Sequence, residues 1–129
     1  MDILDKEQYI LIYRTSYLLL LTTVYAMYQN KNFMLPGSIF LTSIHYWKKP
    51  DYSYRRYLDI VVTTSALSYQ HYLAYNSQYA IIYYSLMGLG KVSYIYGKYS
   101  YQKDNWNSTY AHMGFHVLAN IASIILYSE

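Results

Sequence analysis

The chain has 129 residues, of which 54% are hydrophobic, 13% are charged and 21 are tyrosines, and its formal net charge is +3. This share of charged residues is about half that of an ordinary globular surface, which argues against a soluble domain, and the small, scattered positive charge argues against nucleic-acid binding. There is no cysteine, so disulfides, thiol nucleophiles and thiolate metal ligands are excluded, and His, Asp and Glu remain as candidate metal ligands.

Five apolar stretches, joined by short polar connections, follow one another along the chain. They cover residues 9–28, 33–47, 57–75, 79–97 and 109–127. All but the second approach the ~20 residues that a helix needs to cross a bilayer, and Tyr and Trp gather at their ends, as in the aromatic belts of membrane proteins. The low mean hydropathy of −0.03 reflects a scale that penalises tyrosine, whose ring is apolar.

The fold prediction is therefore all-α: a single transmembrane domain over residues 1–129, built as a polytopic membrane helix bundle of about five transmembrane helices. A soluble, tyrosine-rich helical bundle is the alternative for the whole chain. It conflicts with runs such as 18–21 and 121–126, which leave almost no polar stripe for water. A cleaved signal peptide is the alternative for the first segment, although the acidic start of the chain is not a basic leader.

Basic residues indicate the orientation of this bundle. With five crossings, the connections at 48–56 and 98–108 lie on the side of the N-terminus, and together they hold six of the Lys and Arg residues. The opposite side has Lys31 alone. Because cytoplasmic loops carry the excess of Lys and Arg, we expect a cytoplasmic N-terminus and an extracytoplasmic or lumenal C-terminus.

Four ionisable residues inside the apolar segments fall at that same N-terminal side. His45 ends the second segment, Asp59 begins the third, and His112 and His116 begin the fifth, where their i,i+4 spacing places both rings on one helix face. Ionisable side chains are costly in a membrane and need a reason. Three His ligands with an open position are a catalytic zinc arrangement, and Asp59 is placed to hold a metal-bound water or to accept its proton.

Each of these histidines alone is better explained as an interfacial residue that lipid head groups satisfy. The set of three, with Asp59 at the same depth, favours a zinc site formed by His45, His112 and His116. His71 lies about 18 Å from Asp59 along its helix, so we expect a packing or interfacial role near the opposite side. Lys91 is expected to extend toward the N-terminal side.

Residues 42–47 (TSIHYW), 56–60 (RYLDI) and 112–118 (H-x-x-x-HVL) resemble the CREST superfamily of integral-membrane hydrolases. That group includes the alkaline ceramidases, the progestin and adipoQ receptors and the Per1-like proteins. The resemblance implies zinc held by three His near the cytoplasmic side, with His45, His112 and His116 as ligands and Asp59 as the acid that positions water. The composition of the chain also resembles that of reading frames from large DNA viruses.

Two departures from the family pattern stand out. The family has a serine four residues before its first His, where this chain has Leu41. We expect Thr42 to supply the hydroxyl instead, because it lies three residues before His45, whereas Ser43 points away. The chain also has five candidate helices where the family has a seven-helix core, so the substrate chamber would lose walls.

The leading functional prediction is a zinc-dependent hydrolase of ceramidase-like type that cleaves a lipid amide or ester. A zinc-activated water would attack the carbonyl, Asp59 would take the proton, and Thr42 would donate to the developing oxyanion. The membrane lipid is the expected partner, as substrate or ligand. The alternatives are a non-catalytic membrane protein that keeps the metal as a structural staple, and one with no metal at all.

Overall fold

The structure, a computed structural model, describes residues 3–129, and within these residues all the regular elements are helices. The helices are α1 (Lys6–Thr15), α2 (Leu18–Tyr28), α3 (Met34–Trp47), α4 (Tyr54–Ala74), α5 (Ala80–Ser100) and α6 (Asn105–Tyr127). The all-helical prediction is confirmed. Every predicted segment is helical, and its ends differ from the observed ends by about one turn at most.

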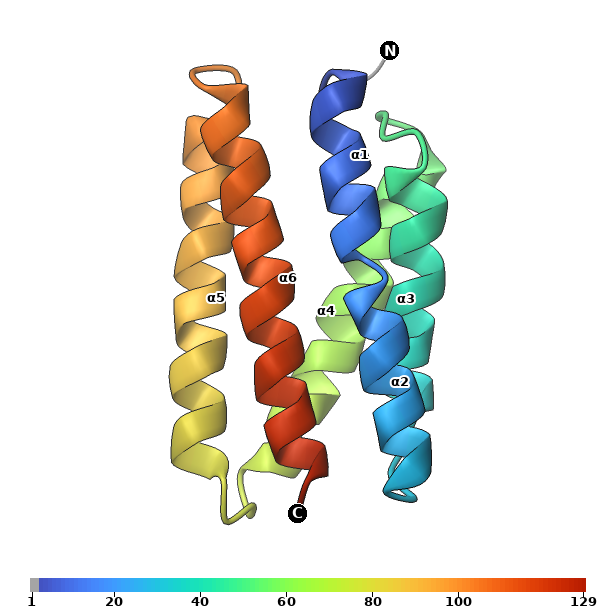
Figure 1. Ribbon diagram of the computed structural model, residues 1–129, viewed down its shortest axis with the longest axis vertical. Coiled ribbons are helices and arrows are strands. Elements are labelled where there is room, and N and C mark those ends of the chain that lie inside the picture. The colour runs from blue at the N-terminus through green and yellow to red at the C-terminus, as the bar shows by residue number, and fades with distance from the viewer. Residues whose placement is uncertain (1–2) are drawn as a thin grey trace.

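The first predicted helix is divided into α1 and α2 by a break that the sequence analysis did not anticipate. At the break, the hydroxyls of Thr15 and Ser16 both donate to the backbone carbonyl of Ile12, at 2.9 and 3.0 Å. Such side-chain bonds compete with the helical ladder and bend helices. The two helices continue nearly in line (Figure 1), so Lys6–Tyr28 forms one bent rod of 23 residues.

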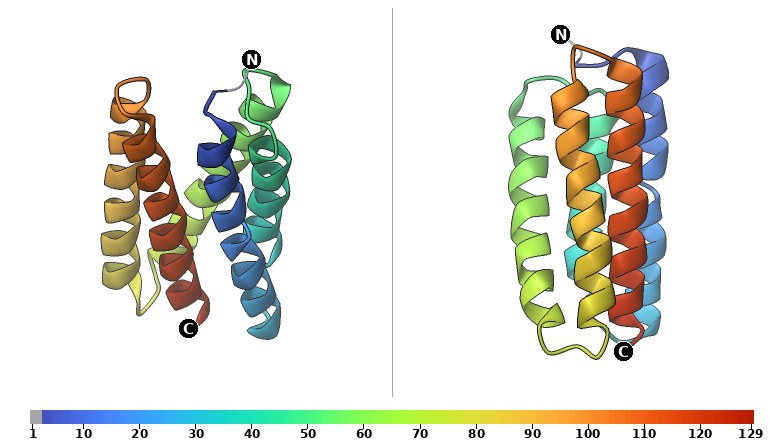
Figure 2. Two further views of the ribbon diagram at one scale, coloured as in Figure 1. Left: turned by 45° about the horizontal axis from the view of Figure 1, so that its top comes forward. Right: turned by 90° about the vertical axis from the view of Figure 1, so that its left-hand side faces the viewer.

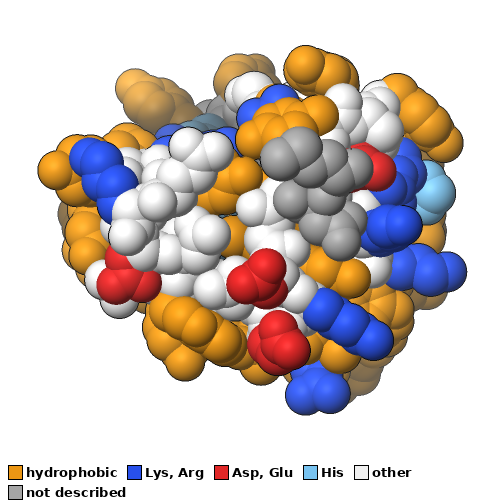
Figure 3. Space-filling view, turned by 90° about the horizontal axis from the view of Figure 1, so that it is seen from above, with side chains coloured by type: hydrophobic (Ala, Val, Ile, Leu, Met, Phe, Trp, Pro, Cys, Tyr) orange, Lys and Arg blue, Asp and Glu red, His pale blue; other side chains and the backbone are white. Residues whose placement is uncertain are grey.

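Successive rods run in opposite directions, and this brings distant parts of the chain to the same end of the bundle (Figure 1). The N-terminus lies at the end where α3 meets α4 and α5 meets α6, and the C-terminus lies at the other. The N-terminal end is tied together by Tyr101, whose hydroxyl donates to the carbonyl of Ile3 at 2.9 Å, and by the Ile3 amide, which donates to Pro50 at 3.1 Å. Charged side chains gather on this end, with hydrophobic ones around them (Figure 3).

The helix α4 crosses the others obliquely, from beside α3 at one end to beside α5 at the other (Figures 1 and 2). The pair α5 and α6 is packed much more closely. A Cβ at Gly97 would lie 3.3 Å from the carbonyl oxygen of Ser108 and 3.4 Å from the side chain of Ala111. Glycine therefore permits this approach, and the oblique course of α4 leaves space on the other side of α6.

The interior consists of two apolar clusters, one toward each end. Near the C-terminus the cluster contains Ala74, Tyr83, Met87, Ala122 and Leu126. Near the N-terminus it contains Leu4, Ile12, Tyr46 and Trp47.

Gln70, which is 1% exposed, joins three helices beside the C-terminal cluster. Its amide nitrogen donates to the hydroxyls of Tyr83 and Ser123, at 3.1 and 2.7 Å, and its carbonyl accepts from Tyr127 at 3.0 Å. Buried polar groups are stable only when they are paired in this way.

Two helical stretches of the described residues are long and apolar enough to cross a membrane, Lys6–Tyr28 and Asn105–Tyr127. The helix α3 has 14 residues, and α4 and α5 carry charged residues and many tyrosines within their 21 residues each. Length and composition alone thus support two membrane spans.

The buried amide of Gln70 gives a test of the fold. Replacing Gln70 by Ala should lower the free energy of unfolding by about 1–3 kcal/mol, because hydroxyls on α5 and α6 lose a partner in a buried place. The matched control is Gln78→Ala, since the side chain of Gln78 is exposed and makes no hydrogen bond. Thermal unfolding followed by circular dichroism measures both, and equal melting temperatures would contradict this account of the core.

Candidate functional site

A cavity of about 560 Å³ lies between the helices, and residues from α1 through α6 line it. This volume is within the range of small-molecule sites, ~300–1,000 Å³. Its wall is mainly apolar but includes charged and imidazole side chains from three helices. These are Arg56, Asp59 and His71 on α4, Lys91 and Lys98 on α5, and His112 and His116 on α6.

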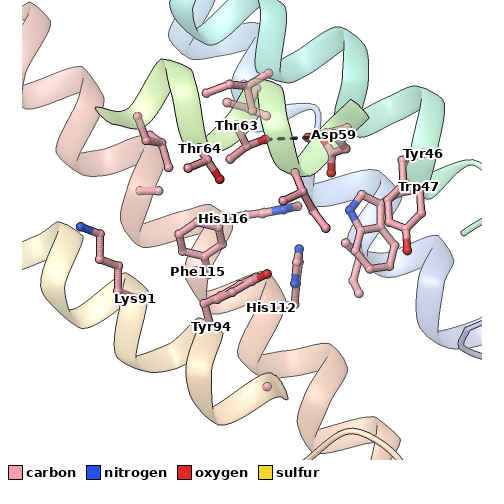
Figure 4. Close-up of a pocket in the computed structure, with 18 of the residues that line it drawn as sticks. Tyr46, Trp47, Asp59, Thr63, Thr64, Lys91, Tyr94, His112, Phe115 and His116 are labelled. Atoms are coloured by element: carbon pink, nitrogen blue, oxygen red, sulfur yellow. Dashed lines mark hydrogen bonds between the residues drawn. The ribbon is translucent and has the colours of Figure 1, made fainter. Parts of the chain in front are cut away.

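His112 and His116 lie side by side on the wall formed by α6, as their spacing predicted (Figure 4). Their ring centroids are 4.7 Å apart. The ring of Trp47, on α3, lies 4.8 Å from His112, and that of Tyr94, on α5, lies 5.8 Å from it. The imidazole of His112 therefore lies between aromatic side chains from two other helices.

His116 is fixed by hydrogen bonds to α1 and within α6. Its Nδ1 lies 2.9 Å from the hydroxyl of Thr15, the residue at the end of α1. Its backbone carbonyl accepts from the amide of Asn120 at 2.7 Å, and Asn120 in turn accepts from Thr22 at 2.6 Å. The break between α1 and α2 thus lies directly at the site. Sequence analysis missed Thr15, and nothing in its local pattern would have singled it out.

Asp59 also lines the cavity, and hydroxyl groups hold its carboxylate. Thr42 and Ser43 each donate to Oδ1 at 3.0 Å, and Thr63 lies at 3.5 Å (Figure 4). The sequence analysis expected Ser43 to point away from the face of His45, and it does: Ser43 is 4% exposed and lines the cavity, whereas His45 is exposed. Thr42 is not among the lining residues. Its hydroxyl contacts Asp59, and its donation to an oxyanion stays a prediction.

His45 does not join the other two histidines. Its side chain is exposed and is absent from the cavity wall, while its backbone carbonyl accepts from Arg55 at 3.0 Å. The inward face of α3 is formed by Ser43, Tyr46 and Trp47. Residues advance by about 100° per position around a helix, so His45, two positions after Ser43, lies on the opposite side. The expected three-histidine site is not formed in this structure.

The donor set that remains is smaller than the predicted one. Within residues 3–129, no three His, Asp or Glu side chains are close enough together to hold one metal ion. His112 and His116 are neighbouring imidazoles, so they could supply two ligands to one metal ion. Asp59 lines the same cavity but does not form a three-ligand group with them. The residues thus fit two ligands of a metal site and leave the third position open.

His71 and Lys91 form a second polar group on the cavity wall. The Lys91 amine lies 2.7 Å from Nε2 of His71, and Nδ1 of His71 lies 2.9 Å from the Tyr83 hydroxyl. His71 therefore lines the same cavity as the histidine pair, whereas the sequence analysis expected a packing or interfacial role near the opposite side. Lys91 turns toward His71, near the end of α4, and does not extend toward the N-terminal side as expected.

The wall of the cavity at the N-terminal end combines basic and aromatic side chains. Arg56 lies over the ring of Tyr52 at 5.5 Å, and Lys98 lies over the ring of Tyr94 at 5.3 Å. Burial raises the pKa of Tyr101 to about 12, so its hydroxyl remains protonated and can donate to Ile3.

Comparison with protein-family models, with curated proteins and with solved structures found no match for this chain. The functional argument therefore rests on the geometry of the cavity and on the motifs in the sequence.

The rotation of α3 can be tested directly because the chain has no cysteine. A cysteine introduced by His45→Cys should react quickly with a maleimide, since position 45 is exposed, whereas one introduced by Ser43→Cys should react slowly. Reaction rates followed by mass shift in detergent measure the difference, with circular dichroism to check folding. Faster labelling at position 43 would mean that α3 is rotated and that His45 faces the histidine pair.

Proposed function

We propose that this chain is a small integral membrane protein with five crossings and that it binds a membrane lipid in its cavity. The outer surface of the helices supports the first part. Large apolar side chains are exposed along the rods, among them Leu21 at 63%, Ile81 at 82% and Val92 at 64%. Water tolerates contiguous apolar surface of this extent poorly, and such surfaces mark interaction with membranes or partners.

The tyrosines support the same proposal. Several lie exposed at or near the ends of helices. They include Tyr28, Tyr54, Tyr57, Tyr72, Tyr75 and Tyr99. An aromatic ring with a polar tip is favoured at the boundary between hydrocarbon and water. The tyrosines thus mark two boundaries, one at each end of the rods.

The single observation that carries the lipid proposal is a cavity whose wall is mainly apolar and whose charged and imidazole groups come from α4, α5 and α6. A ligand with an apolar chain and a polar head matches such a wall better than a wholly polar metabolite does. In a membrane, lipids are also the amphiphiles at highest local concentration. The oblique course of α4 (Figure 2) is consistent with entry of a lipid from the side.

Hydrolysis of an amide or ester bond in that lipid, as in CREST-type enzymes, is the activity we propose for this cavity. What supports it is that His112, His116 and Asp59 line one cavity, with Asp59 held by Thr42 and Ser43. A zinc ion bound there would polarise the carbonyl and lower the pKa of water. The residues of the chain would hold the ion through the two imidazoles, orient Asp59 through its hydroxyl partners, and leave that carboxylate available to accept a proton.

The second candidate is a non-catalytic lipid-binding membrane protein, with a structural metal or none. The exposure of His45 favours it, because two histidines alone are a weak metal site. In that case the imidazoles would serve as hydrogen-bonding groups of the cavity, as His116 does with Thr15. The two candidates differ in metal content and in turnover.

The orientation is testable with terminal tags. The basic residues at the N-terminal end of the bundle favour a cytoplasmic location for that end by the positive-inside rule. A tag before Met1 should then be cytoplasmic, and a tag after Glu129 should be extracytoplasmic or lumenal. Protease protection of each tag in sealed vesicles measures this. Both tags on one side of the membrane would contradict five crossings.

Metal content separates the candidates. For the hydrolase, the purified protein should contain about one zinc per chain, and His112→Ala or His116→Ala should abolish it, whereas His45→Ala, the matched control, should retain it. Asp59→Asn should lower hydrolysis of ceramide-like amides or phospholipid esters by ~10²–10⁴-fold, the usual contribution of a general base.

The opposite outcomes are equally informative. Loss of zinc from His45→Ala would show that α3 turns His45 inward when metal binds. A zinc-loaded wild type with no turnover on any of these lipids would favour the structural metal, and no zinc in any variant would leave lipid binding as the function.

A further inference from the structure

The polar group around Lys91 and His71 lies away from the histidine pair and has no role in the hydrolysis proposed above. In Figure 4, Lys91 lies at the opposite end of the drawn residues from Asp59 and Trp47. His71 is held between helices by its contact with the Tyr83 hydroxyl, at 2.9 Å, and by the Tyr84 hydroxyl, which donates to its backbone carbonyl at 2.6 Å. The imidazole is therefore a fixed partner for the amine of Lys91.

The hydrogen bond between Lys91 and His71 does not neutralise the positive charge of Lys91. An ammonium group only donates hydrogen bonds, so Nε2 of His71 accepts from it at 2.7 Å. The other nitrogen, Nδ1, then carries the hydrogen and donates to Tyr83. The imidazole is neutral in this arrangement and orients the ammonium without cancelling its charge. Two further N–H groups of Lys91 remain for a ligand in the cavity that Lys91 lines.

The charges on the cavity wall are unbalanced. Arg56, Lys91 and Lys98 line the cavity, and Asp59 is the acidic residue among the lining residues. The carboxylate of Asp59 accepts from hydroxyls of α3. Among residues 3–129, the structure has one salt bridge, between Arg55 and Asp51 at 3.0 Å. Neither of these residues lines the cavity. Arg56 is half-buried, and Lys91 and Lys98 are exposed residues that still line the cavity. An anionic group on a bound ligand would balance this excess of positive charge.

We propose that Lys91, held in position by His71, binds the oxyanion head group of a single-chain lipid, either a carboxylate or a phosphate monoester. The apolar chain would lie along the wall that Leu67, Phe115 and Ala119 contribute to. A volume of about 560 Å³ suits one chain better than two. This inference rests on the proposed function, in that the cavity must take a lipid, and it adds the charge and the place of the head group.

The test compares three ligands of equal chain length: palmitate, hexadecyl phosphate and hexadecanol. Their binding to the full chain in detergent is measured with radiolabelled ligand. The wild type should bind at least one anion more tightly than the alcohol. Lys91→Met keeps an apolar stem and removes the charge, so it should weaken binding of that anion by roughly 10- to 100-fold, the usual worth of a charge-assisted hydrogen bond, while leaving the alcohol unaffected.

Two further variants serve as controls. Lys91→Arg retains a cation and should keep the preference for the anion. Lys103 lies in the connection before α6, over the ring of Tyr99 and outside the cavity wall. Lys103→Met should therefore behave as the wild type. Circular dichroism shows whether each variant keeps its helices. The anion whose binding depends on Lys91 identifies the head group as carboxylate or phosphate.

Three results would overturn the inference. If folded Lys91→Met binds both anions as tightly as the wild type does, Lys91 merely extends toward a membrane surface. If the wild type binds hexadecanol but no anion more tightly, the cavity takes lipid and only the head-group assignment fails. If the wild type binds none of the three ligands, the proposed lipid-binding function fails together with this inference.

Discussion

Hydrogen bonds between helices are the interaction on which the rest of this structure depends. The helices carry apolar side chains outward, so their polar side chains have to find partners inside, and among the described residues every buried side-chain nitrogen or oxygen has one. The helix α6 is central to this network, through Asn120 to Thr22 and through Ser123 to Gln70. A buried polar group without a partner would cost more free energy than a formed hydrogen bond contributes. These pairs therefore also determine which faces of the helices pack together.

The same pairing shapes the candidate site. Thr15 ends α1 and contacts His116, while the neighbouring Ser16 bonds back to its own helix, so the break in the first rod and the placement of the histidine have one cause. Asp59 is likewise placed by two hydroxyls of α3. The side chains that could take part in a reaction, His116 and Asp59, are therefore held by Thr and Ser residues of other helices. Their positions come from the packing of the helices around one cavity and not from any local motif.

Sequence reasoning located the helices and the local part of the site, and it failed where rotation about a helix axis mattered. Apolar length identified each helix, and i,i+4 spacing fixed the His112–His116 pair because both residues share one helix. The side of α3 on which His45 lies depended on how this helix is rotated about its own axis. Burial of Tyr46 and Trp47 against Leu4 and Ile12 turns the aromatic side of α3 inward and carries His45 outward. No spacing along α3 alone specifies that contact, since its other half comes from the beginning of the chain.

The cavity also explains why this chain carries ionisable residues that its fold does not need. An apolar interior would pack without His71 or Asp59, and placing such groups away from water costs free energy. Departures from the rules of stable packing concentrate where a protein has a function. Here they fall along one cavity wall, with the hydroxyl-held carboxylate and the paired imidazoles in one part and the Lys91–His71 contact in another. The wall also includes apolar side chains such as Leu67 and Phe115 and hydroxyls such as Thr64, so a ligand that extends along the cavity would meet both kinds of group, which a compact polar molecule would not.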